Sequence, residues 1–465
     1  MFRNLTGGEI GVKIRANIFA ENTMKIPSDV KFIIDTLEKR GYEAYAVGGC
    51  VRDAILGREP NDWDITTNAT PDQMKECFAG QHVIETGLKH GTLTVMLHHV
   101  GYEVTTYRID GEYSDHRRPD SVEFVKDLRL DLERRDFTVN AMATADGENI
   151  VDLFDGRGDL ERHVIRCVGD PYKRFTEDAL RILRALRFAS VYDFAVDPDT
   201  ANAAFELRDT LKNVSGERIC VELKKLLCGK GAERILTLYP WIIFTIFPEL
   251  EPMEGRKQNN PHHAYDVWTH TVKTIANSPA DPIYRLTMLF HDSGKPKAYY
   301  LGEDGFDHFK GHPKYSVEIA ETCLPRLKPD TESFRKILVY IREHDLRVPA
   351  DKKAIRKQMV RLGVDTYMAL FPILKADYLS QNPALIPQKK VQFDEVERLS
   401  NEILAEGDCV TLKALAVGGK DMMALGLKGK DVGEMLNTLL LRVCDEKIQN
   451  EKEALLTEAQ RLING

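Results

Sequence analysis

Residues 44–67, AYAVGGCVRDAILGREPNDWDITT, decide the fold of this chain. The first four residues form a short apolar run that predicts a strand, and Gly48-Gly49 predict a tight turn. Residues 50–56 predict a helix, because a glycine follows where helices end in the left-handed conformation. Backbone N–H groups at such a turn attract an anion, and Arg52 adds a forked cation. The pattern therefore predicts a site for phosphate groups.

Asp62 and Asp64 follow this turn in DWDIT, where polar and apolar residues alternate with the period of a strand. The two carboxylates would share one face, while Trp63 and Ile65 would face the core. Carboxylates this close repel each other unless a divalent cation lies between them. Two Mg²⁺ ions about 3.5–4 Å apart could hold the attacking and leaving oxygens of a phosphoryl transfer. A DxD or GG pair alone is usually a surface feature, but the two together in this order indicate a nucleotide site.

Glu103 is a candidate third carboxylate. Residues 91–98 and 102–107 predict two strands of a hairpin, and Glu103 shares a face of the second strand with Thr105 and Tyr107. If that face adjoins the DxD strand, Glu103 becomes a third metal ligand. Otherwise it is a solvent-facing residue on an edge strand.

GGCVRD at 48–53 and NDWDITT at 61–67 together resemble the head of the nucleotidyltransferase superfamily. The resemblance is to the class II tRNA nucleotidyltransferases, or CCA-adding enzymes, and to their relatives, the bacterial poly(A) polymerases. It implies an α+β head in which Asp62, Asp64 and Glu103 hold Mg²⁺. The implied reaction is nucleotidyl transfer from CTP and ATP to the 3′ end of tRNA.

Two later motifs extend the resemblance. Residues 133–141, ERRDFTVNA, resemble the family motif RRDFTxNA. In the family this motif links the head to the neck and contacts sugar and phosphates. Without the resemblance, such a charge cluster would be interpreted as a solvated helix start. The resemblance assigns nucleotide binding to Gly48, Gly49, Arg52, Arg135, Asp136, Asn140, Asp178, Arg181, Arg184 and Arg187.

Residues 174–188 predict one continuous helix on which Asp178 and Arg181 lie one turn apart. An ordinary ion pair between Glu177 and Arg181 is the plain interpretation. A carboxylate and a guanidinium can also imitate a template base and select C or A. EDxxR resembles the nucleotide-selecting motif of CCA-adding enzymes, whereas poly(A) polymerases tend to have RED followed by proline; here Ala179 follows.

Two more segments favour CCA addition. Residues 110–119 resemble a loop that is implicated in the switch to adding the terminal A and that CC-adding relatives lack. The glycine turns and lysines after Val410 resemble the tRNA-gripping tail of CCA-adding enzymes, and they suit contact with a nucleic-acid backbone. A plain linker and a helical hairpin with solvated lysines are the alternatives. The candidate RNA-binding residues of the tail are Lys420, Lys428 and Lys430.

A second set of chemical groups is strung across helical stretches in the order His…His-Asp…Asp. This order resembles the HD phosphohydrolase domain, in which such ligands converge on a divalent metal that can activate water. The resemblance implies a metal site for Mn, Ni, Co or Fe. His312 and His344 match positions that accommodate a second metal or a phosphate. The site residues are His270, His291, Asp292 and Asp377.

The bulk properties fit this interpretation. The chain has 465 residues, enough for about three domains, and a net charge of −8, which argues against a uniformly basic surface but permits a local basic strip. Eight cysteines without a CxxC pair predict reduced thiols in a cytoplasmic protein. No apolar run reaches the roughly 18 residues of a membrane helix, and no signal peptide or obligatory protein partner is evident.

We therefore expect an α+β head followed by helical domains, with tRNA, CTP and ATP as partners. The alternatives are a poly(A) polymerase or a CC-only or A-only tRNA nucleotidyltransferase, and an HD phosphohydrolase or RNA-binding protein with a non-catalytic head. The expected division is an N-terminal extension (1–23), the head (24–150), the neck and body (151–250), the HD domain (251–380) and a helical tail (381–465).

Overall fold

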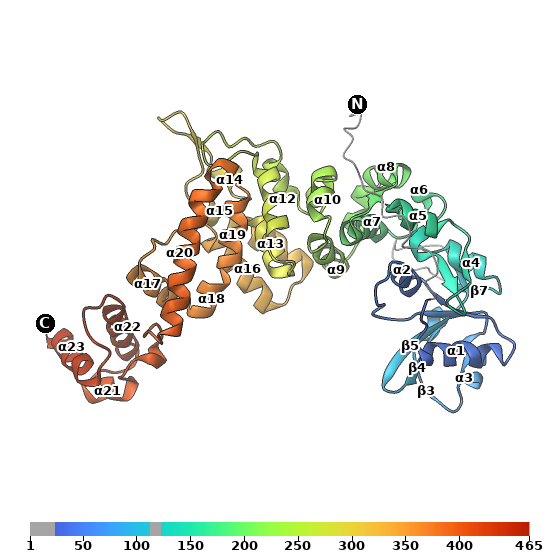
Figure 1. Cartoon of the computed structure of the whole chain (residues 1–465), viewed down its shortest axis with the longest axis horizontal. Coiled ribbons are helices and arrows are strands. Elements are labelled where there is room, and N and C mark those ends of the chain that lie inside the picture. Colours follow the sequence, from blue (N-terminus) through green and yellow to red (C-terminus); the bar gives the residue numbers. More distant parts are fainter. Residues whose placement is uncertain (1–23, 112–121, 465) are drawn as a thin grey trace. The chain divides into compact units, whose positions relative to one another are not determined.

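The computed structural model describes residues 24–111 and 122–464 (Figure 1). The predicted extension at 1–23 lies outside the described residues, as does the predicted loop 110–119 except for its first two residues.

The chain divides into two compact units. The first contains the residues up to 181 and residues 195–207, and the second contains residues 182–194 and the residues from 208 onward. The finer domain boundaries expected from the sequence stay predictions.

The first unit is built on a seven-stranded sheet with the strand order β3-β4-β5-β2-β1-β8-β9. Neighbouring strands are antiparallel except β2 and β5, which run parallel. The hairpin predicted around Glu103 is confirmed as β4 and β5. The strands are β1 (Ala44–Val47), β2 (Ile65–Thr67), β3 (His82–Gly87), β4 (Thr92–Leu97), β5 (Val100–Thr106), β8 (Met142–Thr144) and β9 (Ile150–Asp152).

Short helices cover this sheet. Helix α1 packs on β1 and β2 through Val30, Ile33, Ile34 and Leu37, the apolar residues that the sequence places at helical spacing. Thr70 begins α3 with a capping box to Gln73. These helices and the sheet confirm the predicted α+β class (Figure 1). The remaining elements of the unit are α1 (Ser28–Glu38), α2 (Gly49–Ile55), α3 (Pro71–Cys77), β6 (Arg108–Asp110), β7 (Val122–Phe124), α4 (Leu128–Glu133), α5 (Gly156–Arg162), β10 (Val164–Ile165), α6 (Pro171–Glu177), β11 (Ala195–Val196) and α8 (Pro198–Glu206).

Two predicted boundaries were wrong. The strand predicted over residues 62–66 begins only at Ile65, so Asp62 and Asp64 lie before β2. The single helix predicted over 174–188 is two helices, α6 and α7 (Leu180–Tyr192), because Asp178 adopts an extended backbone with φ −141° between them. Its carboxylate then accepts a hydrogen bond from the Leu180 N–H at 3.1 Å and caps α7.

The described part of the second unit is helical apart from one small hairpin. Helices α12, α13, α16 and α19 lie side by side in its central part (Figure 1). Its helices after α7 are α9 (Gly216–Leu227), α10 (Ala232–Leu238), α11 (Trp241–Ile246), α12 (Val267–Asn277), α13 (Pro282–Phe290), α14 (Lys295–Ala298), α15 (His312–Cys323), α16 (Thr331–Glu343), α17 (Lys352–Leu362), α18 (Val364–Ala369), α19 (Phe371–Leu379), α20 (Ile386–Ala405), α21 (Gly419–Ala424), α22 (Lys430–Cys444) and α23 (Lys452–Asn464). The hairpin consists of β12 (Tyr300–Leu301) and β13 (Asp307–His308).

All eight cysteines lie among the described residues as free thiols, and six of them are buried. Among the described residues, the longest helix has 20 residues, and none combines the length and the apolar character needed to cross a bilayer.

Candidate functional site

Asp62, Asp64 and Glu103 gather beside the start of β2, since the charges of both Asp62 and Glu103 act on Asp64. β2 starts directly after Asp64 and pairs in parallel with β5, with Ile65 opposite Val104. One residue earlier in this register, Asp64 lies opposite Glu103. All three acidic residues are exposed. The structure therefore brings together the three residues that the sequence proposed as metal ligands.

The environment of Asp64 favours a bound cation. Surrounding protein atoms, although they leave part of the residue exposed, remove water from its carboxylate, and the charges of Asp62 and Glu103 repel it. Together they raise the pKa of Asp64 to about 6, although the positive charge of Arg135 acts in the opposite direction. Clustered carboxylate oxygens are the hard ligands that Mg²⁺ prefers, and a cation there would relieve their repulsion. The donor set thus fits Mg²⁺.

The glycine turn lies beside these carboxylates. The Val47 N–H donates to the Asp64 carbonyl oxygen at 3.0 Å, which joins the end of β1 to the acidic segment. Gly48 has φ +84°, a conformation that favours glycine, and α2 begins at the next residue. A Cβ atom at position 48 would come within 2.9 Å of Arg135 Nη1. The turn, Arg135 and Asp64 therefore form one site.

Arg52 supports the turn from inside the protein. It is only 7% exposed, and its Nε and Nη2 atoms donate to the Asp53 carboxylate at 3.0 and 2.9 Å. Its Nη1 donates to Asn140 Oδ1, and Asn140 Nδ2 donates in turn to Asp136 Oδ1 at 2.9 Å. Three residues proposed for nucleotide binding thus form one buried network that ties α2 to the RRDFT segment. A direct contact of Arg52 with phosphate stays a prediction.

Asp131 is a buried carboxylate beside the site that the sequence did not reveal. It is fully buried and accepts hydrogen bonds from Arg134 at 2.8 Å and from Arg135 at 3.3 Å. Burial alone would raise the pKa of Asp131, but these two guanidinium groups hold it below its usual range. The Thr66 hydroxyl also donates to Asp131 at 3.2 Å. The spacing of Asp131 from both arginines, one helical turn, was the signal that could have revealed it.

Asp178 and Arg181 both contact other protein groups. Arg181 Nη1 pairs with Glu177 at 2.7 Å, as the plain interpretation of the sequence expected, and donates to the Arg174 carbonyl at 3.1 Å. Its Nη2 donates to the Arg134 carbonyl at 3.3 Å. Arg181 is therefore fixed against the ERRD segment, and its role in base selection stays a prediction.

Arg184 and Arg187 belong to the second unit, where both pair with the buried Glu222 of α9. Arg184 Nη1 lies 3.2 Å and Arg187 Nε 2.7 Å from the Glu222 carboxylate. The Arg187 guanidinium also lies 3.4 Å from the centre of the Phe188 ring. These contacts stabilise the packing of α7 on α9, and nucleotide binding by either arginine stays a prediction.

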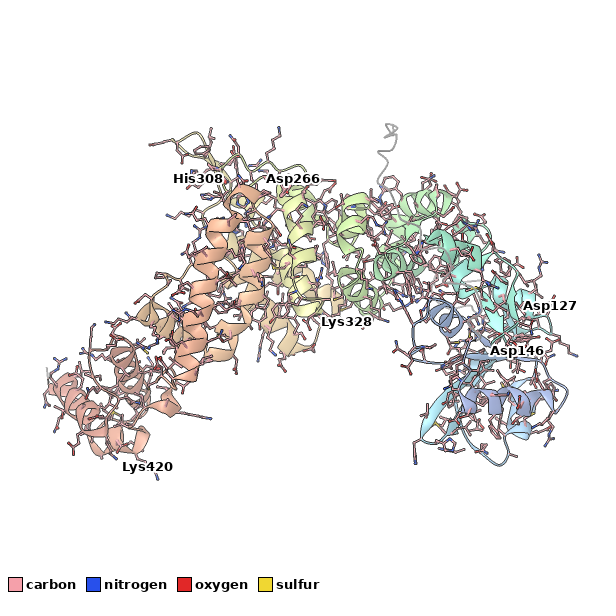
Figure 2. All side chains as sticks on the ribbon, viewed as in Figure 1. Asp127, Asp146, Asp266, His308, Lys328 and Lys420 are labelled. Atoms are coloured by element: carbon pink, nitrogen blue, oxygen red, sulfur yellow. The ribbon has the colours of Figure 1, made fainter. Side chains whose placement is uncertain are left out.

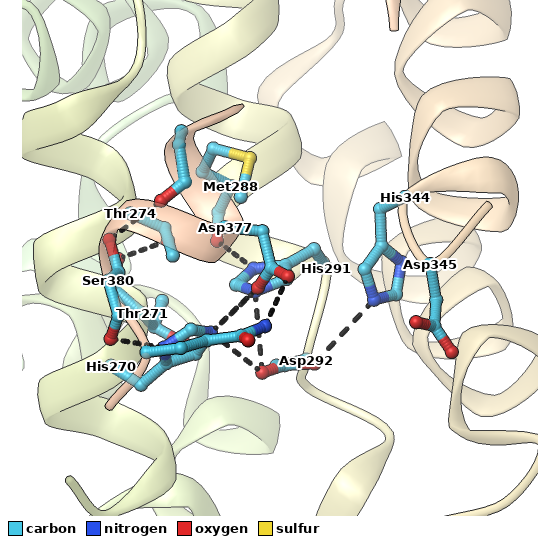
Figure 3. A network of polar contacts seen from close by, with 12 residues as sticks. His270, Thr271, Thr274, Met288, His291, Asp292, His344, Asp345, Asp377 and Ser380 are labelled. Atoms are coloured by element: carbon cyan, nitrogen blue, oxygen red, sulfur yellow. Dashed lines mark hydrogen bonds and ion pairs between the residues drawn. The ribbon is translucent and has the colours of Figure 1, made fainter. Parts of the chain in front are cut away.

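The second unit contains a buried cluster around Asp292 (Figure 3). Asp292 Oδ2 lies 3.4 Å from His270 Nε2 and 3.3 Å from His291 Nε2, and His270 Nε2 lies 3.0 Å from Asp377 Oδ1. The other carboxylate oxygen of Asp292 lies 3.1 Å from His312 Nε2 and 3.6 Å from His344 Nε2. Asp292 thus belongs to two groups that could each hold a metal ion.

The four imidazoles of this cluster share one orientation. Each Nδ1 atom lies within hydrogen-bond distance of a backbone carbonyl oxygen, and each Nε2 atom faces the carboxylates. A carbonyl accepts only from N–H, so Nδ1 carries the proton and Nε2 keeps its lone pair for a metal. The carbonyl partners of His270, His291, His312 and His344 are Ser380, Met288, Phe309 and Ile341, at 3.0, 2.6, 2.9 and 2.7 Å.

A pocket of about 840 Å³ opens beside this cluster. Asp292, His312 and His344 are among its lining residues. Lys295 also lines it, with its ammonium group 2.7 Å from Asp292 Oδ2. The further cations along the pocket are Lys310, Arg347 and Lys389.

The proposed RNA-binding lysines of the tail are all exposed. Lys420 lies in α21, labelled in Figure 2, and Lys428 and Lys430 flank the turn at Gly429, which has φ +55°. Lys430 pairs with Glu434 at 2.8 Å. RNA binding by these three lysines stays a prediction.

Residues 44–166 match the family model described as the poly A polymerase head domain, and residues 193–253 match the model described as the probable RNA and SrmB-binding site of polymerase A. The CCA-adding enzyme of Levilactobacillus brevis is 34% identical over 429 residues, which cover 91% of this chain and 95% of that protein. The CCA-adding enzyme of Ligilactobacillus salivarius is 33% identical over 456 residues, which cover 94% and 98%. Among solved structures, the Bacillus stearothermophilus CCA-adding enzyme in complex with CTP superposes with a TM-score of 0.68 and 28% identity over 93% of this chain and 96% of that one.

Proposed function

Because this chain belongs to the family of CCA-adding enzymes, we propose that it adds C, C and A to the 3′ end of tRNA from CTP and ATP without a nucleic-acid template. The family model that matches residues 44–166 is described as the head domain of poly A polymerase, so this match alone does not separate the two activities. The relatives from Levilactobacillus brevis and Ligilactobacillus salivarius align over nearly the full length and are CCA-adding enzymes, which favours this activity.

The observation that carries the proposal is the gathering of Asp62, Asp64 and Glu103 beside the Gly48 turn and Arg135. These carboxylates would hold Mg²⁺. Bound there, the metal would make the terminal 3′-hydroxyl more acidic and would neutralise the leaving pyrophosphate. The chain's own contribution is to bring the tRNA end and the nucleotide together in line for transfer.

The residues around the turn would bind the triphosphate. Gly48 and Gly49 allow phosphate oxygens to approach the backbone N–H groups, because neither residue carries a Cβ. Arg135 lies 2.9 Å from the Cβ position of Gly48 and is held by Asp131, so it would neutralise charge on the same phosphates.

Base selection would use Asp178 and Arg181. A carboxylate accepts from the amino group of C or A, and a guanidinium donates to ring acceptors. The contacts of Arg181 with Glu177 and with the Arg134 carbonyl restrict its position, as a template requires. The exposed lysines of the tail would contact the tRNA backbone without reading bases.

The experiment that tests this proposal extends tRNA transcripts in Mg²⁺ with labelled CTP and ATP, separately and together. The transcripts end before CCA, after CC and after CCA, and products are resolved by single nucleotides. Growth that stops at CCA supports the proposal. Unlimited addition of A would indicate a poly(A) polymerase, and addition of CC alone or of A alone would indicate a split-function enzyme.

We propose, as a second candidate function, metal-dependent phosphohydrolysis at the Asp292 cluster. The observation that favours it is the common orientation of four imidazole Nε2 atoms around one carboxylate beside a cation-lined pocket.

Because Asp292 belongs to both ligand groups, Asp292→Asn should remove more bound Mn²⁺ per chain than His344→Ala, which affects only one group. Metal analysis after dialysis measures this, and equal losses would argue against two groups that share Asp292.

A further inference from the structure

Three cations on α17 pair with carboxylates from the C-terminal part of the chain. Lys353, Arg356 and Lys357 share one face of this helix, because three and four residues separate the first from the other two. Lys357 pairs with Asp445, the C-cap residue of α22. We call the three cations and their carboxylate partners the α17 network. Its carboxylates are Asp408, Asp445 and Glu446.

Arg356 lies at the centre of the α17 network. Its Nε atom lies 2.6 Å from the Asp408 carboxylate, and its Nη1 atom lies 2.9 Å from the Glu446 carboxylate. Lys353 Nζ lies 3.0 Å from the same Glu446 carboxylate. The Arg356 side chain is only 13% exposed, so water screens its ion pairs less than it screens those at the surface.

Glu446 occupies a backbone position that usually belongs to glycine. It has φ +57°, and the following Lys447 N–H donates to the Arg442 carbonyl oxygen at 3.0 Å, a pattern that ends many helices with a left-handed glycine. A glutamate in this conformation strains the backbone. Its carboxylate, however, makes two ion pairs with α17. The contact with α17 therefore explains this residue type better than the fold of α22 does.

The C-terminal helices α21, α22 and α23 have a hydrophobic core of their own. Among the described residues, Val360 is the only residue of α17 that packs against it, whereas Ile355 and Met359 belong to a separate core with residues of α18, α19 and α20. The contact of α17 with the C-terminal helices is therefore mainly ionic, and polar contacts of this kind permit one part to move against the other. The buried members of the C-terminal core are Cys409, Leu415, Val417, Met422, Leu439, Leu440, Cys444, Leu455 and Ala459.

We propose that the α17 network is an electrostatic latch, which holds the C-terminal helices against α17 and opens when the phosphate backbone of an RNA replaces the three carboxylates on α17. The same cations bind carboxylates and phosphates, and an arginine can bind either with two N–H groups. This inference goes beyond nucleotide addition and rests on the proposed function only for the choice of tRNA as the RNA.

Cross-linking of the full chain with a carbodiimide tests the latch, because this reagent joins only amines and carboxylates that are already in contact. Peptide mass spectrometry gives the yield of the Lys353–Glu446 cross-link. This yield is divided by that of Lys336–Glu332, an ion pair within α16 at 2.6 Å. A saturating tRNA transcript should lower the ratio about threefold or more, as expected when an exposed ion pair is displaced. An unchanged ratio would overturn the proposal.

Two variants with opposite expected effects separate a latch from an ordinary structural contact. Glu446→Gly removes a competing carboxylate and relieves the strained backbone, so it should bind the transcript about threefold more tightly. Lys353→Gln removes a cation and should bind it about threefold more weakly. Lys328→Gly is the matched control, because Lys328 also has a left-handed backbone, with φ +49°, and an ion pair, with Glu217. It should leave the affinity unchanged.

A structural contact would give both network variants an effect of the same sign. Weaker or unchanged binding of the transcript by Glu446→Gly would therefore overturn the latch, as would a parent protein that binds no transcript. Failure of nucleotide addition is a separate result, because cross-linking and binding are measured without CTP or ATP. A protein that binds tRNA and adds nothing would contradict the proposed function and leave the latch to be decided by these two measurements.

Discussion

The guanidinium of Arg135 lies against the backbone of Gly48, since a Cβ atom at residue 48 would come within 2.9 Å of Arg135 Nη1. The positive charge of Arg135 also acts to lower the pKa of Asp64, although burial and the charge of Asp62 have larger effects and the pKa is raised overall. One arginine thus joins the glycine turn to the acidic cluster.

Gly48→Ala should destabilise the first unit and strongly reduce nucleotide addition. The backbone of the new alanine would have to keep φ +84°, and its methyl group would displace Arg135. A backbone strained in this way costs about 1–3 kcal/mol. Urea unfolding and the rate of AMP addition to tRNA ending in CC measure the two effects. Gly41→Ala is the matched control, because Gly41 has φ +85° but no atom within 4 Å of its Cβ position. It should lose stability and keep the addition rate per folded molecule; a similar loss of rate in both variants would contradict the role of the Arg135 contact.

Asp131→Asn should cost about 3–5 kcal/mol of folding stability, because it leaves Arg134 and Arg135 without their buried carboxylate. The native pKa of Asp131 is lowered, so its ionised form contributes stability above the unfolded pKa of 3.8, and this contribution is lost as the pH falls through the native value. Unfolding midpoints between pH 3 and 7 in wild type and variant measure both effects. Asp155→Asn, at an exposed ion pair with Arg162, is the control and should change stability little. An Asp131→Asn protein as stable as wild type would contradict this account.

The concentration of Mg²⁺ that gives half-maximal addition should rise as the pH falls below about 6. Asp64 has a raised pKa of about 6 without metal, and Mg²⁺ binds only the ionised carboxylate, so protons compete with the metal below that value. One pH unit below the pKa, the requirement should be about tenfold higher. Rates over a series of Mg²⁺ concentrations from pH 5 to 8 test this. A half-maximal concentration independent of pH would exclude Asp64 as a ligand.

Asp178→Ala should relax the choice of nucleotide. Loss of one base contact is worth about 1–3 kcal/mol of discrimination, so incorporation of UTP or GTP relative to CTP and ATP should rise about tenfold or more. Asp170→Asn is a suitable control, because Asp170 also caps a helix, through the Tyr172 N–H at 2.9 Å, and is not a predicted selector. Equal selectivity in wild type and Asp178→Ala would remove the template role.

The sequence was most informative where local pattern and fold agree. The glycine turn and the hairpin around Glu103 follow from turn chemistry and periodicity, and both are observed. The proximity of Glu103 to Asp64 required the parallel pairing of β2 with β5, which a single sequence suggests but does not determine.

Other features depended on tertiary contacts. The break at Asp178 was missed because alanine and leucine around it favour helix, while the extended Asp178 is fixed by capping α7. The burial of Asp131 and of Arg52 was missed because charged residues are usually exposed, and only their buried partners make them stable inside. The hairpin at Tyr300 is too short for a periodic signal.

The most direct test of the central claim is the rate of AMP addition to tRNA ending in CC by two variants of the full chain. Asp64→Asn removes a carboxylate of the head, and His291→Ala removes a ligand of the Asp292 cluster. The account predicts that Asp64→Asn lowers the rate at least about a thousandfold, as expected for loss of a group that supplies about 4 kcal/mol to the transition state, while His291→Ala adds AMP at nearly the wild-type rate. The account would be contradicted if Asp64→Asn added AMP at the wild-type rate, or if AMP addition were lost in His291→Ala and not in Asp64→Asn.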